Sequence, residues 1–137
     1  MSTSGNLERL NSFINNSATI VEKAGVDIAA PAHKAVMYDA NGDVVIATSG
    51  ENAIGLILSS SPDPISAGQQ VHILIKYIGL VEAGAPIEKG AKITINASGQ
   101  AIPADDDTFI FGRAFTDAEA AGQVIQAQIN QMGFVPA

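Results

Sequence analysis

The chain has 137 residues, of which 47% are hydrophobic and 5% aromatic, and it carries a formal net charge of −7 without any cysteine. This length suits one domain with an aliphatic core, and the absence of cysteine excludes disulfides, thiolate nucleophiles and Cys-based zinc sites. The acidic balance argues against direct binding to nucleic acid, because affinity for the phosphate backbone comes from Lys and Arg.

The first 25 residues are predicted to form an arm or short helix, followed by a β-rich domain over residues 26–137. Four apolar residues of Ser4–Asn15 fall at helical spacing: Leu7, Leu10, Phe13 and Ile14. A helix this short is marginal alone, so its order is expected to depend on docking against the body or a partner. The chain shows neither a signal-peptide pattern nor an apolar run of the roughly 20 residues that span a bilayer. We therefore expect synthesis in the cytoplasm and no membrane partner.

From Ala35 onward the pattern is typical of β-structure. The segments Ala35–Tyr38 and Val44–Ala47 flank Asp39–Asp43, whose Asn-Gly pair favours the positive φ of a tight hairpin turn. Ala53–Leu58 is expected to form the next strand. The sequence thus predicts a hairpin followed by a further short strand.

The most β-prone segment is Val71–Val81, in which apolar residues alternate with others. One face is expected to carry Val71, Ile73, Ile75 and Tyr77, and the other His72, Leu74, Lys76 and Ile78. Because the second face is mixed, we expect another subunit or another element to cover part of it. Leu74 and Ile78 are therefore candidate subunit contacts, as are the tail residues Met132, Phe134 and Val135.

Four further short strands are predicted in the second half: Ala91–Asn96, Gln100–Ile102, Thr108–Phe115 and Gln123–Ile129. Asp117–Gly122 has room for a single helical turn between the last two. A faint echo, made of a strand, a Ser-Gly turn and an apolar-Gly-apolar run, links Val44–Leu58 to Ile93–Ala114 and leaves open a duplicated unit. Overall the pattern predicts a mainly β fold, a small barrel or sandwich of about seven to nine short strands.

Residues with catalytic or metal-binding chemistry are few. His33 and His72 lie in different segments without a nucleophile motif, so they are expected to be packed or surface residues. Asp105–Asp107 is the densest carboxylate cluster, but it lacks the ligand spacing of a calcium loop and is better interpreted as an acidic turn that deters edge pairing. The sequence predicts no enzyme activity and no metal.

Nucleotide-binding patterns are also missing from the sequence. No glycine-rich phosphate loop stands between a strand and a helix. The lysines are scattered, and two tyrosines are too few to stack a series of bases. These observations predict that the protein has no cofactor and no direct contact with nucleic acid.

The body of the chain resembles the capsid decoration, or cement, proteins of tailed bacteriophages. The resemblance runs from Val26 to Ile129 and depends on the order and spacing of short glycine-containing motifs. These are Asn52–Leu56, Val71–Val81 with its internal Gly79, Ile87–Ile93, Ser98–Ala101, Phe111–Ala114 and Gly122–Ile125. The first 25 residues and the tail Asn130–Ala137 depart from the pattern.

The resemblance implies a non-enzymatic protein of the virion, made in the bacterial cytoplasm and bound to the outside of the phage head. Such proteins commonly bind as homotrimers and tie neighbouring major capsid proteins together. An arm that orders on contact can bridge capsomers where many copies offset its loss of entropy. Leu7, Leu10, Phe13 and Ile14 are the candidate capsid contacts.

Three other interpretations stay open at this point. Glycine and proline before a strand also occur in biotinyl and lipoyl carrier domains, but Lys34 and Lys89 lack the neighbours of a modified lysine. A second alternative is another virion module, such as part of a tail or fibre. A third is a hydrolase whose site the sequence does not reveal.

Overall fold

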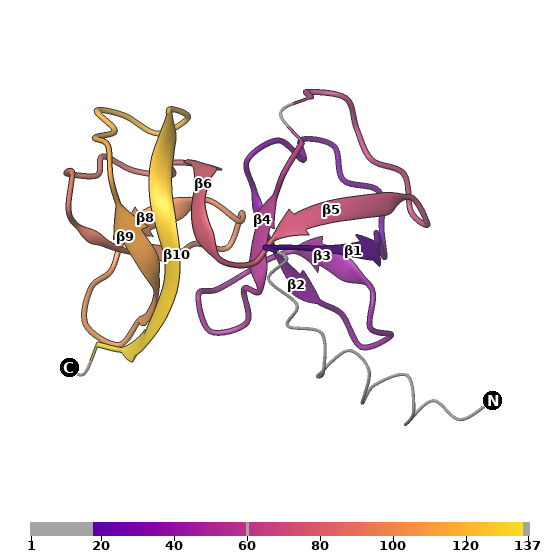
Figure 1. The fold of residues 1–137 in the computed structure, drawn as a ribbon, viewed down its shortest axis with the longest axis horizontal. Coiled ribbons are helices and arrows are strands. Elements are labelled where there is room, and N and C mark those ends of the chain that lie inside the picture. The colour runs from indigo at the N-terminus through magenta and orange to yellow at the C-terminus, as the bar shows by residue number, and fades with distance from the viewer. Residues whose placement is uncertain (1–17, 60, 136–137) are drawn as a thin grey trace.

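The computed structural model describes residues 18–59 and 61–135, and the regular structure of these residues is entirely β (Figure 1). Ten strands form two five-stranded antiparallel sheets, one from each half of the chain. Neither sheet closes into a barrel. The predicted mainly β class is confirmed in its sandwich-like form. The predicted capsid contacts in the arm, Leu7, Leu10, Phe13 and Ile14, lie outside the described residues.

The first sheet has the strand order β1-β5-β4-β2-β3. Its strands are β1 (Thr19–Lys23), β2 (Ala35–Tyr38), β3 (Val44–Ile46), β4 (Gly55–Ile57) and β5 (Gln70–Leu74). The predicted hairpin of β2 and β3 is confirmed. Its turn is held by the Asp39 carboxylate, which accepts hydrogen bonds from the N–H groups of Asn41 at 2.8 Å and Asp43 at 3.0 Å.

The strand β1 was not among the predicted strands. It lies within the segment that the sequence assigned to the arm, yet Thr19 to Lys23 pair with Leu74 to Gln70 of β5. Alternate β1 residues are half-buried, so one face of the strand packs on the body. The chain therefore joins the folded body before residue 26.

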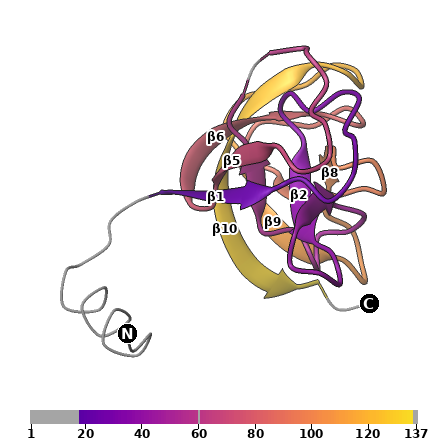
Figure 2. The same ribbon diagram turned by 90° about the vertical axis from the view of Figure 1, so that its right-hand side faces the viewer.

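The second sheet has the order β6-β10-β9-β7-β8. Its strands are β6 (Tyr77–Glu82), β7 (Lys92–Ile95), β8 (Ala101–Pro103), β9 (Phe109–Ala114) and β10 (Val124–Phe134). The long, curved β10 runs along the side of this half (Figure 2). It extends beyond the predicted Ile129, because after a register shift its end pairs Gly133 with Ile110 and Phe134 with Phe109. The helical turn considered for Asp117–Gly122 does not form, since Ala118 there bridges Ile87.

The two sheets are copies of one arrangement, because adding five to each strand number of the first order gives the second. The details agree. Val36 pairs with Gly55 as Ile93 pairs with Gly112. Asn96 holds its turn as Asp39 does, accepting N–H groups from Ser98 and Gln100 at 2.9 and 3.0 Å. The chain is thus a tandem repeat of a single five-stranded unit.

The sequence echo links the two repeats correctly at their apolar-Gly-apolar runs, but it matches the wrong pair of turns. Gly55 and Gly112 of the apolar-Gly-apolar runs are equivalent in the structure. The Ser-Gly turns are not, because Gly99 has a φ of 75° and corresponds to Gly42 with a φ of 80°. Gly50 belongs to a different loop and packs closely on Thr94 of β7. Ser-Gly is too common in turns to identify which turns match.

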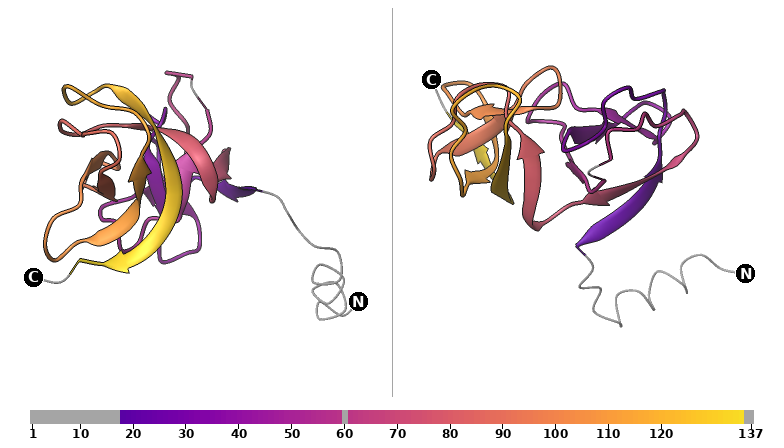
Figure 3. Two further views of the ribbon diagram at one scale, coloured as in Figure 1. Left: turned by 60° about the vertical axis from the view of Figure 1, so that its left-hand side comes forward. Right: turned by 90° about the horizontal axis from the view of Figure 1, so that it is seen from above.

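The predicted single strand Val71–Val81 is two strands in two sheets. The chain leaves the first sheet after Leu74 and enters the second at Tyr77, which has a φ of 71°. Seen from above, the halves lie side by side with β6 at their boundary (Figure 3). The expected alternation is interrupted at the break, because Tyr77 is 58% exposed although Val71 and Ile73 of the same expected face are buried.

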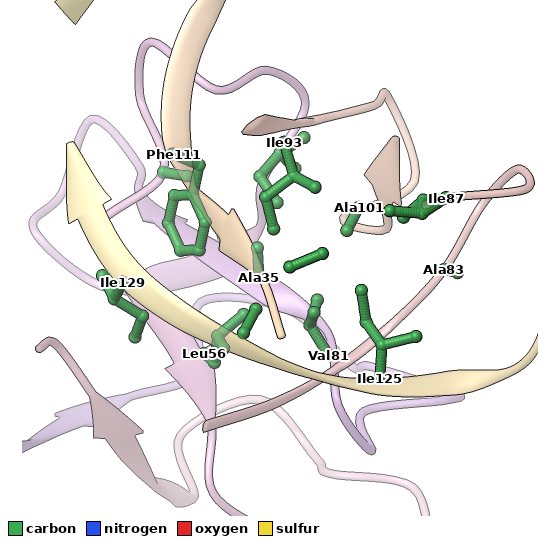
Figure 4. Packing of buried hydrophobic residues seen from close by; sticks show 14 of the residues in the cluster. Ala35, Leu56, Val81, Ala83, Ile87, Ile93, Ala101, Phe111, Ile125 and Ile129 are labelled. Carbon is green, nitrogen blue, oxygen red and sulfur yellow. The ribbon is translucent and has the colours of Figure 1, made fainter. Parts of the chain in front are cut away.

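The core has two clusters, of which one lies in the first half and the other joins both halves. In the shared cluster Leu56 of the first sheet lies near Val81 and Ile129 of the second (Figure 4). Phe111 is its largest fully buried side chain. The boundary between the halves is therefore a hydrophobic core, and it is also where the candidate interaction surface forms.

Candidate functional site

A groove of about 200 Å³ opens where the two halves meet, and we call it the junction groove. Its lining residues are apolar except for His33, and none is acidic, although the chain as a whole has a charge of −7. The lining residues are His33, Leu56, Ile57, Leu58, Leu74, Ile78, Gly79 and Leu80. Apolar side chains that stay exposed around a groove are typical of interaction sites.

The groove exists because strand β6 lies closely against the first sheet. A side chain at Gly79 would begin under 3.0 Å from Cδ2 of Leu74, so a larger residue here would require the Leu74 side chain to shift. Alternation along β6 then buries Val81 in the core and leaves Ile78 and Leu80 about half exposed. On the opposite side Leu58, which follows β4, is 43% exposed.

Glu82, two residues after Leu80, connects the halves beside the groove. Its backbone N–H donates to the carbonyl of His33 at 2.9 Å. Its carboxylate forms a salt bridge with Lys34 at 2.8 Å and accepts a hydrogen bond from Gln100 at 2.7 Å. This set of contacts ties the segment before β2 to β6 and to the loop before β8.

The electrostatics of Glu82 reflect two opposing effects. Burial by itself raises the pKa of this carboxyl, but hydrogen bonds from Lys34 and Gln100, together with the positive charge of Lys34, outweigh it. The net result is that the pKa of Glu82 lies below its ordinary value of 4.5. The ionised carboxylate is thus preferentially stabilised in the folded protein.

We expect Glu82→Gln to remove a pH-dependent part of the stability. Because the folded pKa is lowered, this contribution is present above the ordinary value and is lost as the pH falls through the folded pKa. The variant should be about 1 kcal/mol less stable at pH 7, and the difference should shrink as the pH falls below the ordinary value of 4.5. Urea denaturation across this range measures it, with Glu88→Gln as an exposed control. A difference that stays constant with pH would contradict this assignment.

The five predicted subunit contacts do not form one surface. Leu74 is only 8% exposed and belongs to the shared core, because β6 of the same chain covers it. Ile78 is 49% exposed and lines the junction groove. Phe134 lines a second hollow, where its ring lies 4.9 Å from that of Phe109. Val135 is half-buried. The side chain of Met132 lies outside what the structure describes.

Sequence reasoning missed Leu58, Leu80 and His33 as lining residues. Leu80 lies two residues after Ile78 along β6, so continuing the same alternation by one step would have placed both on one face. Leu58 and His33 carry no such signal, because only the tertiary contact between the halves brings them to β6.

The described residues contain no cluster of three or more His, Asp or Glu side chains that would suit a metal ion. Asp105–Asp107 instead forms the turn before β9, where the N–H of Asp107 donates to the carbonyl of Val135 at 2.8 Å. His72 is exposed on β5, and His33 adopts a φ of 60° beside the groove. Within residues 18–59 and 61–135, no helix is long and apolar enough to cross a membrane.

Comparison with known proteins gives one informative result. The chain matches no protein-family model and no curated protein sequence. Its fold is shared with a phage protein. The N base of head fiber gp8.5 of bacteriophage phi29 is similar with a TM-score of 0.60 and 23% sequence identity, over 82% of this chain and 92% of that one. At this identity the likeness establishes the fold.

Proposed function

We propose that this chain is a structural protein of a bacteriophage virion that binds the outer surface of the head. In that position it bridges neighbouring major capsid proteins and stabilises their lattice, as a homotrimer and without an enzymatic role. It is made in the bacterial cytoplasm and ends on the surface of the particle. The carrier and hydrolase interpretations have no observation that favours them.

The observation that carries this proposal is the fold shared with the head fiber base. The similarity covers 82% of this chain, so it extends into both repeats and is not confined to one small motif. The order of glycine-containing motifs independently resembles phage decoration proteins. Two separate lines of reasoning, one from sequence and one from structure, therefore support a structural role in a phage virion.

The junction groove supplies a surface suited to this role. Its exposed Leu58, Ile78 and Leu80 offer apolar contact on a rigid β scaffold. Apolar side chains surrounded by polar ones are typical of protein interfaces. We propose that this groove, together with the arm residues Leu7, Leu10, Phe13 and Ile14, contacts the capsid.

A second candidate function is that of a fibre module, in which the chain attaches a projecting appendage to the head. The similarity to the N base of the phi29 head fiber favours it. Both candidates need head binding, and they differ in whether a further virion protein is attached to the bound chain.

We expect the purified protein to decorate expanded, empty heads of its own phage at a fixed ratio to the major capsid protein. Co-sedimentation followed by densitometry measures the ratio. Removal of Met1 to Asn16 should leave a folded body, because β1 begins at Thr19, but should weaken head binding. Failure of the full chain to co-sediment with the heads would contradict the proposed function. Unchanged binding of the truncated chain would contradict only the contribution of the arm to head binding.

A further inference from the structure

Strand β6 is an end strand of the second sheet, and its peptide groups alternate between two directions. Ala83, just after β6, donates its N–H to the Gln123 carbonyl at 2.7 Å. Val81 and Gly79, two and four residues earlier, lie opposite Ile125 and Ala127 of β10 and point in the same direction as Ala83. These odd-numbered residues therefore form the ladder with β10. The even-numbered residues of β6 point the other way.

The even-numbered set begins with Glu82, which donates its N–H away from β10 to the carbonyl of His33. Ile78 and Leu80 share its direction, so their N–H and C=O groups also point away from β10, on the groove side of the strand. Within residues 18–59 and 61–135 no backbone partner for these groups is present. The groove is thus bordered by an open strand edge.

The side chains of the same two residues are exposed as well, Ile78 by 49% and Leu80 by 47%. An exposed edge that is also hydrophobic invites pairing with another chain, and proteins normally protect such edges with charge or proline. Neither protection is present at Ile78 or Leu80. Peptide recognition by strand addition uses this combination, in which main-chain hydrogen bonds give affinity and a pocket for a side chain gives selectivity.

The tandem repeat provides an internal comparison for this edge. In the first unit, strand β1 takes the place of β6, and Val21 and Lys23 stand where Leu80 and Glu82 stand in the second. On β1 the exposed Lys23 protects the edge. On β6 the charge of Glu82 is already paired with Lys34. Of the two equivalent edges, only that of β6 borders the junction groove.

Charge indicates what kind of strand would fit. The groove lining contains no carboxylate, and Lys76 lies two residues before Ile78 with its ammonium 5.0 Å from the Tyr77 ring centroid, while Lys34 is already paired with Glu82. We propose that the open edge of β6 binds an extended strand of a second protein, with an apolar side chain for the groove and acidic residues flanking it. Strand binding at this edge does not depend on the proposed function; only the identification of the major capsid protein as the source of the strand rests on it.

The edge is tested with a synthetic strand, acetyl-Asp-Val-Thr-Leu-Thr-Val-Asp-amide, titrated into the isotope-labelled full chain and followed by amide NMR shifts. We expect saturable shifts at Ile78, Leu80 and Leu58 and none at Val21. The same peptide with every amide N-methylated should give none, because it cannot donate hydrogen bonds. Equal shifts at Val21, or no saturable shift at millimolar peptide, would overturn the inference.

Matched variants separate the strand edge from its side chains. Leu80→Pro removes the outward N–H and leaves the ladder to β10 intact, since Leu80 does not donate to β10. We expect it to weaken peptide binding about tenfold, as loss of one or two hydrogen bonds requires. Val21→Pro, the same change at the equivalent place on β1, should bind as the unaltered chain does. Leu80→Lys, which copies the protection of β1 at an exposed position, provides a second test should the proline variant not fold.

Expanded heads then identify the source of the strand. If the unaltered chain binds heads and Leu80→Pro binds about tenfold more weakly, the capsid protein supplies the strand. Equal binding of the two would overturn the capsid protein as its source. If the unaltered chain binds the peptide but not heads, the edge is confirmed while the proposed function fails. The two failures are therefore distinguishable.

Discussion

Gly112→Ala is expected to destabilise the protein by about 3 kcal/mol or more, because strands β9 and β10 would have to separate. A side chain at Gly112 would begin under 3.0 Å from the backbone carbonyl oxygen of Gln128. A backbone atom of a central strand cannot move aside as a flexible side chain can. The strand pair concerned also positions Ile129 and the end of β10. Chemical denaturation measures the loss as a lower midpoint with an unchanged slope.

The repeat predicts a parallel result at Gly55, where a side chain would meet the carbonyl of Leu74 in the same way. The control is Gly68→Asn, since Gly68 has open space around it and a φ of 87°, a backbone region in which Asn is the best-tolerated alternative. We expect this control to cost less than about 1 kcal/mol. If Gly112→Ala lowers the free energy of unfolding by no more than the control does, β9 and β10 do not approach each other as closely as described.

Leu74→Gln is expected to cost about 2–4 kcal/mol, because it places an amide in the shared core without hydrogen-bond partners. The substitution introduces the residue that the second unit has at the equivalent position, since Leu74 in β5 corresponds to Gln128 in β10. Leu74 is buried because β6 crosses it at Gly79, whereas Gln128 is only half-buried. Thermal unfolding of the two single variants measures the asymmetry.

The reverse exchange, Gln128→Leu, is the control. Gln128 is only half-buried, so we expect its change to stay within about 0.5 kcal/mol, as for most surface substitutions. Equal costs for the two exchanges would mean that β6 does not bury the face of the first sheet. The pair of variants thus tests whether the second unit serves as the hydrophobic cover of the first.

Much of the fold was predictable because its signals are local. Asn-Gly at the first hairpin specifies the turn between β2 and β3, and the strands β7 and β9 lie within the apolar runs predicted for them. The pattern failed where tertiary contacts decide. Nothing in Val71–Val81 marks the change of sheet at Tyr77, since apolar residues continue through it.

The candidate site was predictable only in part for the same reason. Ile78 was identified because it lies on a mixed face of an apolar run. Leu74, on the same predicted face, is a core residue, because the strand that covers it begins only three residues later in the chain. Leu58 and His33 come from the other half. Periodicity describes one strand at a time and so cannot reveal a groove between two units.

The tandem arrangement has a consequence for synthesis on the ribosome. Every strand of the first sheet pairs within residues 19–74, so this half can complete its hydrogen-bond ladder before the second half has emerged. Until β6 follows, however, the nascent unit exposes Leu56 and Leu74, which later form part of the shared core. The first half therefore completes its backbone pairing early, but its exposed apolar side chains favour aggregation until the second half packs against it.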